Sequence, residues 1–135
     1  MRIRTRIAPS PTGVAHIGTA YMALFNYAYA IKNDGDFIIR IEDTDRARFV
    51  EGAEDVIYDA LRWLEIPYME APDKGGPFAP YRQSERLTVY KEHVDTLVAS
   101  GHAYYCFCTP ERLESMRAQQ QANKQIPRYD RTCLH

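Results

Sequence analysis

The stretch "RIAPSPTGVAHIGTA", residues 6–20, places two prolines, two glycines and one histidine between segments of different periodicity. Residues 2–7 read Arg-Ile-Arg-Thr-Arg-Ile, and this period of two predicts a short strand that stops at Pro9. Residues 17–33 follow a helical period, with Gly35 as a natural stop. The apolar stripe of this helix is Ala20, Leu24, Tyr27, Ala28 and Ile31. The quoted stretch is therefore predicted to turn a strand into a helix.

The next segment, "DFIIRIED" at residues 36–43, has the near-continuous apolar run of a parallel strand that is covered on both faces. Strand, helix and strand together predict a right-handed βαβ unit and an α/β fold. In open parallel sheets ligands bind beyond the carboxyl ends of the strands, which is where residues 9–19 lie. The free N–H groups at the start of the following helix favour an anion such as phosphate. The stretch matches neither the dinucleotide fingerprint nor the phosphate loop of GTPases, so both classes are disfavoured.

Further along the chain the same reasoning predicts three helices and one strand. The helices are expected at 51–65, 84–100 and 110–122, the last one capped by Thr109 with Pro110 at its first position. Residues 102–108 are predicted to form a strand, and residues 66–80, with four prolines and two glycines, a connection. The apolar stripes are Ala53, Ile57, Ala60, Leu61 and Leu64 in the first helix, and Leu87, Tyr90, Val94, Leu97 and Val98 in the second.

Composition excludes several classes of protein. With 135 residues, 45% of them hydrophobic and 26% charged, the chain is long enough for a core and unlike collagen, coiled coils or disordered chains. No apolar run approaches the roughly 20 residues of a membrane helix, and no signal-peptide core follows the arginine-rich start. A cytoplasmic protein without a membrane partner is expected. The net charge of −1 disfavours a protein that wraps nucleic acid, although residues 106–135 carry five basic against three acidic residues.

Two residues near the predicted turn have both a functional and a structural interpretation. His16 could donate hydrogen bonds to phosphate oxygens, or it could simply satisfy the turn. Arg6 and Glu42 lie near the carboxyl ends of the two strands, where a guanidinium could clamp a carboxylate and a carboxylate could attract an ammonium group. The alternative is a purely structural ion pair. Arg2 and Arg4 share the alternation of Arg6 and are interpreted as a solvated strand face.

The cysteines and one histidine have the spacing of a metal site. Cys106 and Cys108 are two apart, as are Cys133 and His135, with 24 residues between the pairs. Residues i and i+2 of an extended chain point to the same side, so each pair can present two ligands. Three thiolates and an imidazole complete a structural, tetrahedral Zn²⁺ site. The alternative is three buried cysteines beside an incidental histidine.

Five blocks of this sequence, in order, resemble the N-terminal part of bacterial glutamyl-tRNA synthetases, which are class I aminoacyl-tRNA synthetases. The blocks are "RIAPSPTG", "HIGTA", "RIEDTDRAR", "GGPFAPYRQSER" and the segment from "CFC" to "CLH". Thr19 holds the fourth position of the signature usually written HIGH. The resemblance implies the N-terminal half of a Rossmann-like nucleotide-binding fold with a small zinc-binding insertion. Residues 1–104 would form the first part of the catalytic domain, and residues 105–135 the zinc-binding segment at the start of the acceptor-end insertion.

The resemblance also implies an activity, which is to activate L-glutamate with ATP and Mg²⁺ and to transfer it to tRNA(Glu). His16 and Thr19 match catalytic positions at the ATP phosphates. The full set of ATP-binding positions is Pro11, Thr12, Gly13, His16, Gly18 and Thr19, and the glutamate-binding positions are Arg6, Ala8, Ser10 and Glu42. Some relatives complete the zinc site with the histidine and others with a tyrosine, which makes Tyr129 a rival to His135. A monomeric full-length enzyme is expected.

Three alternatives remain: a glutamyl-queuosine tRNA(Asp) synthetase-like enzyme, a small nucleotidyltransferase, and a non-catalytic, zinc-dependent RNA-binding module. The family's KMSKS-type loop and anticodon-binding part are absent from the sequence, so a fragment that does not charge tRNA alone is expected.

The acids of "DTDR" at 43–46 are interpreted as loop and helix-cap residues. Tyr81, Arg82 and Arg86 are expected to shape the loop and the start of the next helix.

Overall fold

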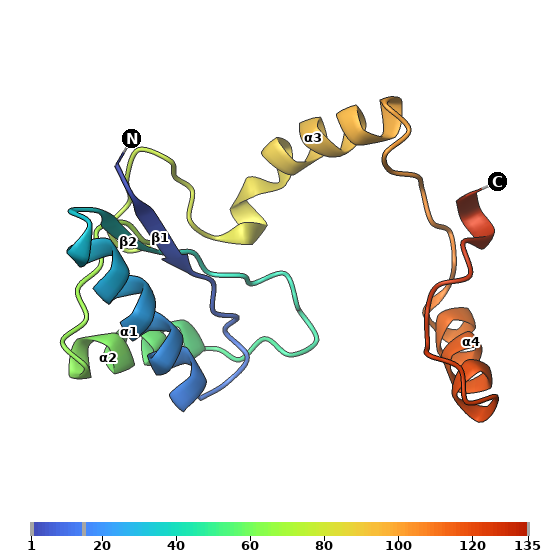
Figure 1. The fold of residues 1–135 in the computed structure, drawn as a ribbon, viewed down its shortest axis with the longest axis horizontal. Coiled ribbons are helices and arrows are strands. Elements are labelled where there is room, and N and C mark those ends of the chain that lie inside the picture. Colours follow the sequence, from blue (N-terminus) through green and yellow to red (C-terminus); the bar gives the residue numbers. More distant parts are fainter. Residues whose placement is uncertain (1, 15, 135) are drawn as a thin grey trace. The chain divides into compact units, whose positions relative to one another are not determined.

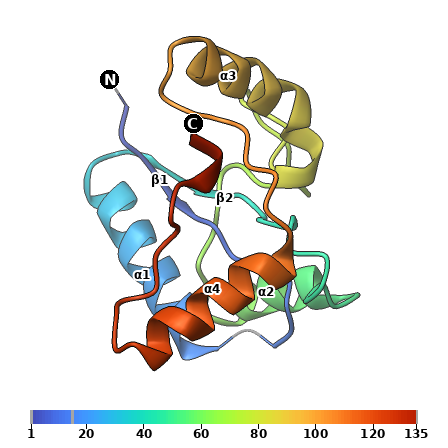
Figure 2. The ribbon, with the colours of Figure 1, turned by 90° about the vertical axis from the view of Figure 1, so that its right-hand side faces the viewer.

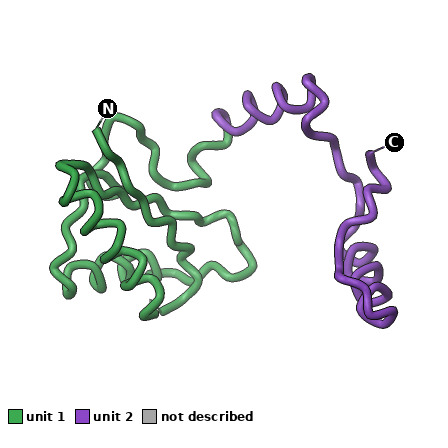
Figure 3. The backbone as a smooth tube through the Cα atoms, viewed as in Figure 1, with its two compact units in different colours: residues 1–87 green, residues 88–135 purple. Residues whose placement is uncertain are grey.

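The computed structural model describes residues 2–14 and 16–134. The chain divides into two compact units, residues 1–87 and residues 88–135 (Figure 3). None of the helices in these described ranges is both long and apolar enough to cross a membrane. The predicted domain boundary after residue 104 stays a prediction.

The first unit contains the predicted βαβ arrangement (Figure 1). Strand β1 (Arg4–Ile7) leads into helix α1 (Ile17–Lys32), which returns the chain to strand β2 (Asp36–Ile39). β1 and β2 pair in parallel, with Arg4 opposite Asp36 and Ile7 opposite Ile39. Helix α2 (Ala53–Trp63) follows and packs against α1. The α/β fold with a parallel sheet is confirmed.

Just after β2, residues 41 and 42 make single backbone hydrogen bonds to two neighbouring segments, one after β1 and one near residue 81. The amide of Glu42 donates to the carbonyl of Pro9 at 2.9 Å, and the amide of Ile41 donates to the carbonyl of Tyr81 at 2.9 Å. An isolated parallel bridge joins Ile41 to Arg82. Residues 40–42 are therefore fixed between the end of β1 and residues 81–83.

The core forms where the apolar run of β2 meets the two helices. Phe37, Ile39 and Ile41 are fully buried, and Ile57 and Leu61 of α2 pack in the same cluster, as the predicted stripe of that helix requires. The predicted stripe of α1 is right for Tyr27, which packs against the core, and wrong for Leu24, Ala28 and Ile31, which are exposed. The buried positions of α1 are Ala23 and Ala30. Their small side chains let the helix backbone approach the strands closely.

The second unit holds helix α3 (Leu87–Ala99) and helix α4 (Pro110–Ala122), with 3-10 helices at Gln83–Arg86 just before the unit and at Thr132–Leu134 near its end (Figures 1 and 2). Thr109 caps α4 as predicted, since its Oγ1 accepts from the Arg112 amide at 3.3 Å.

The strand predicted at 102–108 is wrong. Residues 103–108 are irregular, because no described segment offers them the backbone partner that a strand needs.

Candidate active site

A cleft of about 500 Å³ lies where β1 turns into α1. The carboxyl end of β1 and the residues after it contribute Arg6, Ile7, Ala8 and Pro9, and the start of α1 contributes His16, Gly18, Thr19 and Met22. Two candidates for glutamate binding, Arg6 and Ala8, therefore share one cleft with three candidates for ATP binding. This is the crevice position expected for a ligand of an open parallel sheet.

His16 is the N-cap residue of α1 and has extended backbone angles. Its Nδ1 accepts a hydrogen bond from the Gly18 amide at 3.0 Å, which satisfies one of the free N–H groups of the first turn. An Nδ1 that accepts carries no proton, so a neutral ring in this arrangement has its N–H at Nε2. The exposed imidazole can thus cap the helix and still donate from Nε2 to an anion. The structural and functional interpretations of His16 are compatible.

Gly18 makes room for the His16 ring. A Cβ atom at this position would lie 2.7 Å from Cε1 and 2.9 Å from Nδ1 of His16. Any larger residue would push the ring away from its capping position. The sequence pattern assigns Gly18 to nucleotide approach, and the structure adds this second reason for a glycine.

Glu42 lies between two arginines at the carboxyl end of the extended β2 segment. Its Oε1 accepts from Arg40 Nη2 at 2.9 Å and from Arg6 Nη1 at 3.3 Å. The hydrogen bond from Arg40, with a smaller contribution from Arg6, lowers the pKa of the Glu42 carboxyl below its usual range. Glu42 is therefore an ionised carboxylate at neutral pH, as binding of an ammonium group requires.

The remaining candidates of the turn do not line the cleft. Pro11 is fully buried and its carbonyl accepts from the Val50 amide at 3.1 Å, while the Thr12 amide donates to the Ser10 carbonyl at 2.9 Å. Gly13 has a φ of 135°, a value that side chains rarely allow. These contacts fix the backbone of the turn, and the proposed roles of Ser10, Pro11, Thr12 and Gly13 in binding stay predictions.

The "DTDR" segment has the loop and cap role that was expected. Asp43 accepts from the Ser84 amide at 2.9 Å and from Ser84 Oγ at 2.5 Å, at the start of the 3-10 helix Gln83–Arg86. Burial raises the pKa of Asp43, but the two hydrogen bonds from Ser84 outweigh it, so the pKa lies below its usual range. Asp45 pairs with Arg48 on the surface at 2.6 Å.

The "PYRQSER" residues shape the loop through contacts that the sequence did not reveal. The Tyr81 hydroxyl donates to the buried Glu70 carboxylate, which also accepts from Arg4 Nη2 at 2.6 Å. Arg4 is exposed, as the interpretation of a solvated strand face expects, and its guanidinium also pairs with Glu70. Arg82 binds Glu54 of α2 through two nitrogens, at 2.8 and 3.0 Å. Glu70 was missed because a single acid in a proline-rich connection has no pattern.

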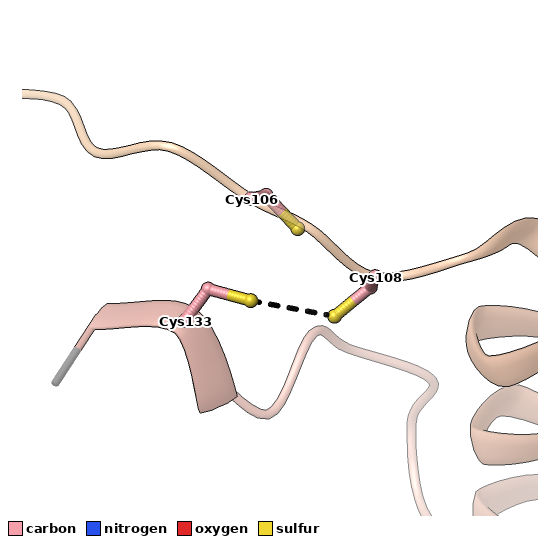
Figure 4. Close-up of side chains that lie close together, drawn as sticks. All are labelled: Cys106, Cys108 and Cys133. Atoms are coloured by element: carbon pink, nitrogen blue, oxygen red, sulfur yellow. Dashed lines mark hydrogen bonds between the residues drawn. The ribbon is translucent and has the colours of Figure 1, made fainter.

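The three cysteines of the second unit come together (Figure 4). Their Sγ atoms all lie within 4.8 Å of one another, and those of Cys108 and Cys133 are 3.6 Å apart. The Tyr129 hydroxyl lies 3.4 Å from the Sγ atoms of both Cys106 and Cys108. The hydrogen bond with Tyr129, helped by the Phe107 amide, lowers the pKa of the Cys133 thiol to about 7. His135 lies outside the described residues.

Residues 2–135 match the family of class I tRNA synthetases (E and Q), catalytic domain. The chain belongs to this family. It is 60% identical to the glutamate–tRNA ligases of Acidothermus cellulolyticus and Pseudomonas aeruginosa, over 98% of its own length and 26–27% of theirs. It therefore spans about a quarter of the length of these relatives.

Solved structures of glutamate–tRNA ligases share the fold. A crystal structure from Elizabethkingia meningosepticum, in complex with its amino acid, is 44% identical with a TM-score of 0.87, over 97% of this chain and 26% of that one. The glutamate–tRNA synthetase of Elizabethkingia anophelis has a TM-score of 0.89 at the same identity and coverage. The resemblance inferred from the five sequence blocks is confirmed.

Proposed function

We propose that this chain carries part of the active site of a glutamate–tRNA ligase and contributes to binding glutamate and ATP. The observation that carries the proposal is the single cleft lined by both Arg6 and His16. An aminoacyl-adenylate joins an amino acid to a nucleotide phosphate, so its site needs amino-acid contacts next to phosphate contacts. The named relatives at 60% identity support the choice of glutamate.

For the amino acid, Arg6 would clamp the side-chain carboxylate and Glu42 would hold the α-ammonium group. A guanidinium has five N–H donors, and the pairing with Glu42 uses one of them, through Nη1. Four donors remain for a ligand. Arg40 keeps Glu42 ionised and fixes Oε1, which leaves Oε2 for an ammonium group.

For the nucleotide, the N-terminal turn of α1 would receive the ATP phosphates. His16 Nε2 and Thr19 would contact the phosphate oxygens while the α-carboxylate of glutamate attacks the α-phosphate and pyrophosphate leaves. Such a reaction depends on positioning and charge stabilisation more than on a general base. Mg²⁺ arriving with ATP would neutralise phosphate charge. The terminal adenosine of tRNA(Glu) would then take the activated glutamyl group from the adenylate, and AMP would leave.

For residues 105–135 we propose a structural zinc site formed by Cys106, Cys108, Cys133 and Tyr129, with His135 as the rival fourth ligand. Tetrahedral zinc with bonds of about 2.3 Å to sulfur places sulfur atoms roughly 3.8 Å apart, and sulfur and oxygen roughly 3.5 Å apart. The observed 3.6 Å between the sulfurs of Cys108 and Cys133, and 3.4 Å from the Tyr129 hydroxyl to the sulfurs of Cys106 and Cys108, fit these values. The donor set of thiolates also suits zinc.

The adenylate site is tested by calorimetric titration of the chain with a non-hydrolysable glutamyl-adenylate analogue, the glutaminyl and aspartyl analogues, and ATP. The glutamyl analogue should bind best, and Arg6→Ala should remove that preference while ATP binding persists. Arg2→Ala is the matched control, because Arg2 pairs with Asp36 on the same strand face and does not line the cleft. Nucleotide binding without preference would contradict glutamate recognition here, and loss of all nucleotide binding would favour the RNA-binding alternative.

The zinc site is tested by measuring metal content under reducing conditions. Wild-type chain should hold one zinc ion, and Cys133→Ser should lose it. Tyr129→Phe identifies the fourth ligand: it should weaken zinc binding if the phenol oxygen coordinates the metal, and it should leave binding unchanged if His135 does. Unchanged zinc content in Cys133→Ser would contradict the site.

A further inference from the structure

The two halves of the cysteine cluster lie far apart in the sequence. Cys106 and Cys108 precede helix α4, and Tyr129 and Cys133 follow it after the chain has reversed direction. Sulfur atoms 3.6 Å apart across a gap of 24 residues need a contact that holds the returning segment against the start of α4. The described structure contains a side-chain contact of this kind.

Arg112, in the first turn of α4, makes this contact. Its Nη2 donates to Asp130 Oδ2 at 2.7 Å and to Thr132 Oγ1 at 2.7 Å. Asp130 directly follows Tyr129, and Thr132 directly precedes Cys133. A single guanidinium therefore connects the helix that begins just after Cys108 to the immediate neighbours of the other two candidate ligands.

The segment that Arg112 holds is a strained turn. Arg131, between the two contacted residues, has a φ of 62°, which non-glycine residues rarely adopt. Asp130 Oδ1 accepts from the Thr132 amide at 3.2 Å and from Thr132 Oγ1 at 2.8 Å, so each carboxylate oxygen has a separate task. One oxygen closes the turn and the other binds Arg112.

We propose that Arg112 is a positioning residue of the zinc site, which joins its two halves through Asp130 and Thr132 and sets their spacing. This inference rests on the proposed zinc site. Contacts that orient metal ligands without touching the metal change metal affinity by about 10- to 100-fold when they are lost. One nitrogen, Nη2, binds both oxygens, and its two hydrogens have fixed directions because they lie in the plane of the guanidinium.

The test is zinc affinity of the reduced chain, measured by competition with a chromophoric chelator. Arg112→Ala and Asp130→Asn should each weaken zinc binding about tenfold, and the double variant should be no weaker than either single one, because the two residues form one contact. Cobalt at saturating concentration should show the same absorption spectrum in all variants, since the ligands themselves remain. Arg112→Lys should stay several-fold weaker than wild type, because a lysine ammonium is not held in the plane that directs the two Nη2 hydrogens toward Asp130 and Thr132.

Glu114→Ala is the control, an exposed charged residue on the same helix with no ion pair among the described residues, and it should bind zinc as wild type does. Wild-type affinity in Arg112→Ala would overturn the inference. Full zinc affinity in Arg112→Lys would also overturn the inference, because a positive charge at position 112 would then be enough to keep zinc binding. Absence of zinc binding in the wild-type chain would instead contradict the proposed site itself.

Discussion

Gly18 shows how one missing side chain governs a candidate catalytic residue. A methyl group at this position would meet the His16 ring at 2.7 Å, so Gly18→Ala should displace the imidazole and break its hydrogen bond to the residue 18 amide. The loss of the cap, about 1 kcal/mol, is offset by the better helix propensity of alanine, so global stability should change little. Nitrogen-15 NMR of the histidine ring should report a changed Nδ1 signal, and ATP affinity should fall. An unmoved Nδ1 signal would contradict the assigned cap.

The residues of the candidate site were predictable where chemistry and topology coincide. Arg6 and His16 stand out because they flank the one turn that a βαβ unit selects for ligand binding, and the cleft contains both. Arg40, Glu70 and Arg112 were not predictable. Their partners lie in space rather than at a fixed sequence spacing, and an isolated arginine or glutamate is typical of any solvated surface.

At the scale of elements, the cap formed by Asp43 links β2 to the 3-10 helix Gln83–Arg86. Asp43→Ala leaves the Ser84 amide without its acceptor in a largely buried place and should lower the free energy of unfolding by about 1 to 3 kcal/mol. Asp45→Ala, which removes a surface pair in the same loop, should cost less. Urea unfolding of both variants measures the difference. Equal losses would contradict the cap.

The same cap has a defined pH dependence. Because the folded-state pKa of Asp43 is lowered, its contribution is fully present above the unfolded pKa of about 4 and is lost as pH falls through the folded value. The difference in stability between wild type and Asp43→Ala should therefore be constant from pH 7 to about pH 5 and should shrink below about pH 4. A difference that grows on acidification would contradict the lowered pKa.

Hydrophobic periodicity predicted the buried face of α2 correctly and missed the two fully buried positions of α1. The buried face of α2 follows its stripe, whereas α1 uses Ala23 and Ala30 because close packing on the strands selects small residues over large ones. The error at 102–108 has a different cause. Aromatic residues such as Tyr104, Tyr105 and Phe107 have strand propensity, but a strand also needs a partner backbone, which the sequence of one segment cannot supply.

At the scale of the whole molecule, the chain is a family member that spans about a quarter of its curated relatives' length. Each of its two units brings together one set of candidate residues, the cleft in the first and the cysteine cluster in the second. The proposed function requires that amino-acid contacts and phosphate contacts meet in the cleft of the first unit.

The most direct test is an NMR titration of the chain with a non-hydrolysable glutamyl-adenylate analogue, following the Arg6 guanidinium, the His16 ring and the Gly18 amide. All three signals should shift together with a single dissociation constant, because one ligand spans the cleft from β1 to α1. The Arg2 guanidinium, which lies in the same unit and does not line the cleft, should not shift and serves as the internal control. Shifts at His16 and Gly18 without a shift at Arg6, or with a different dissociation constant there, would contradict the shared site.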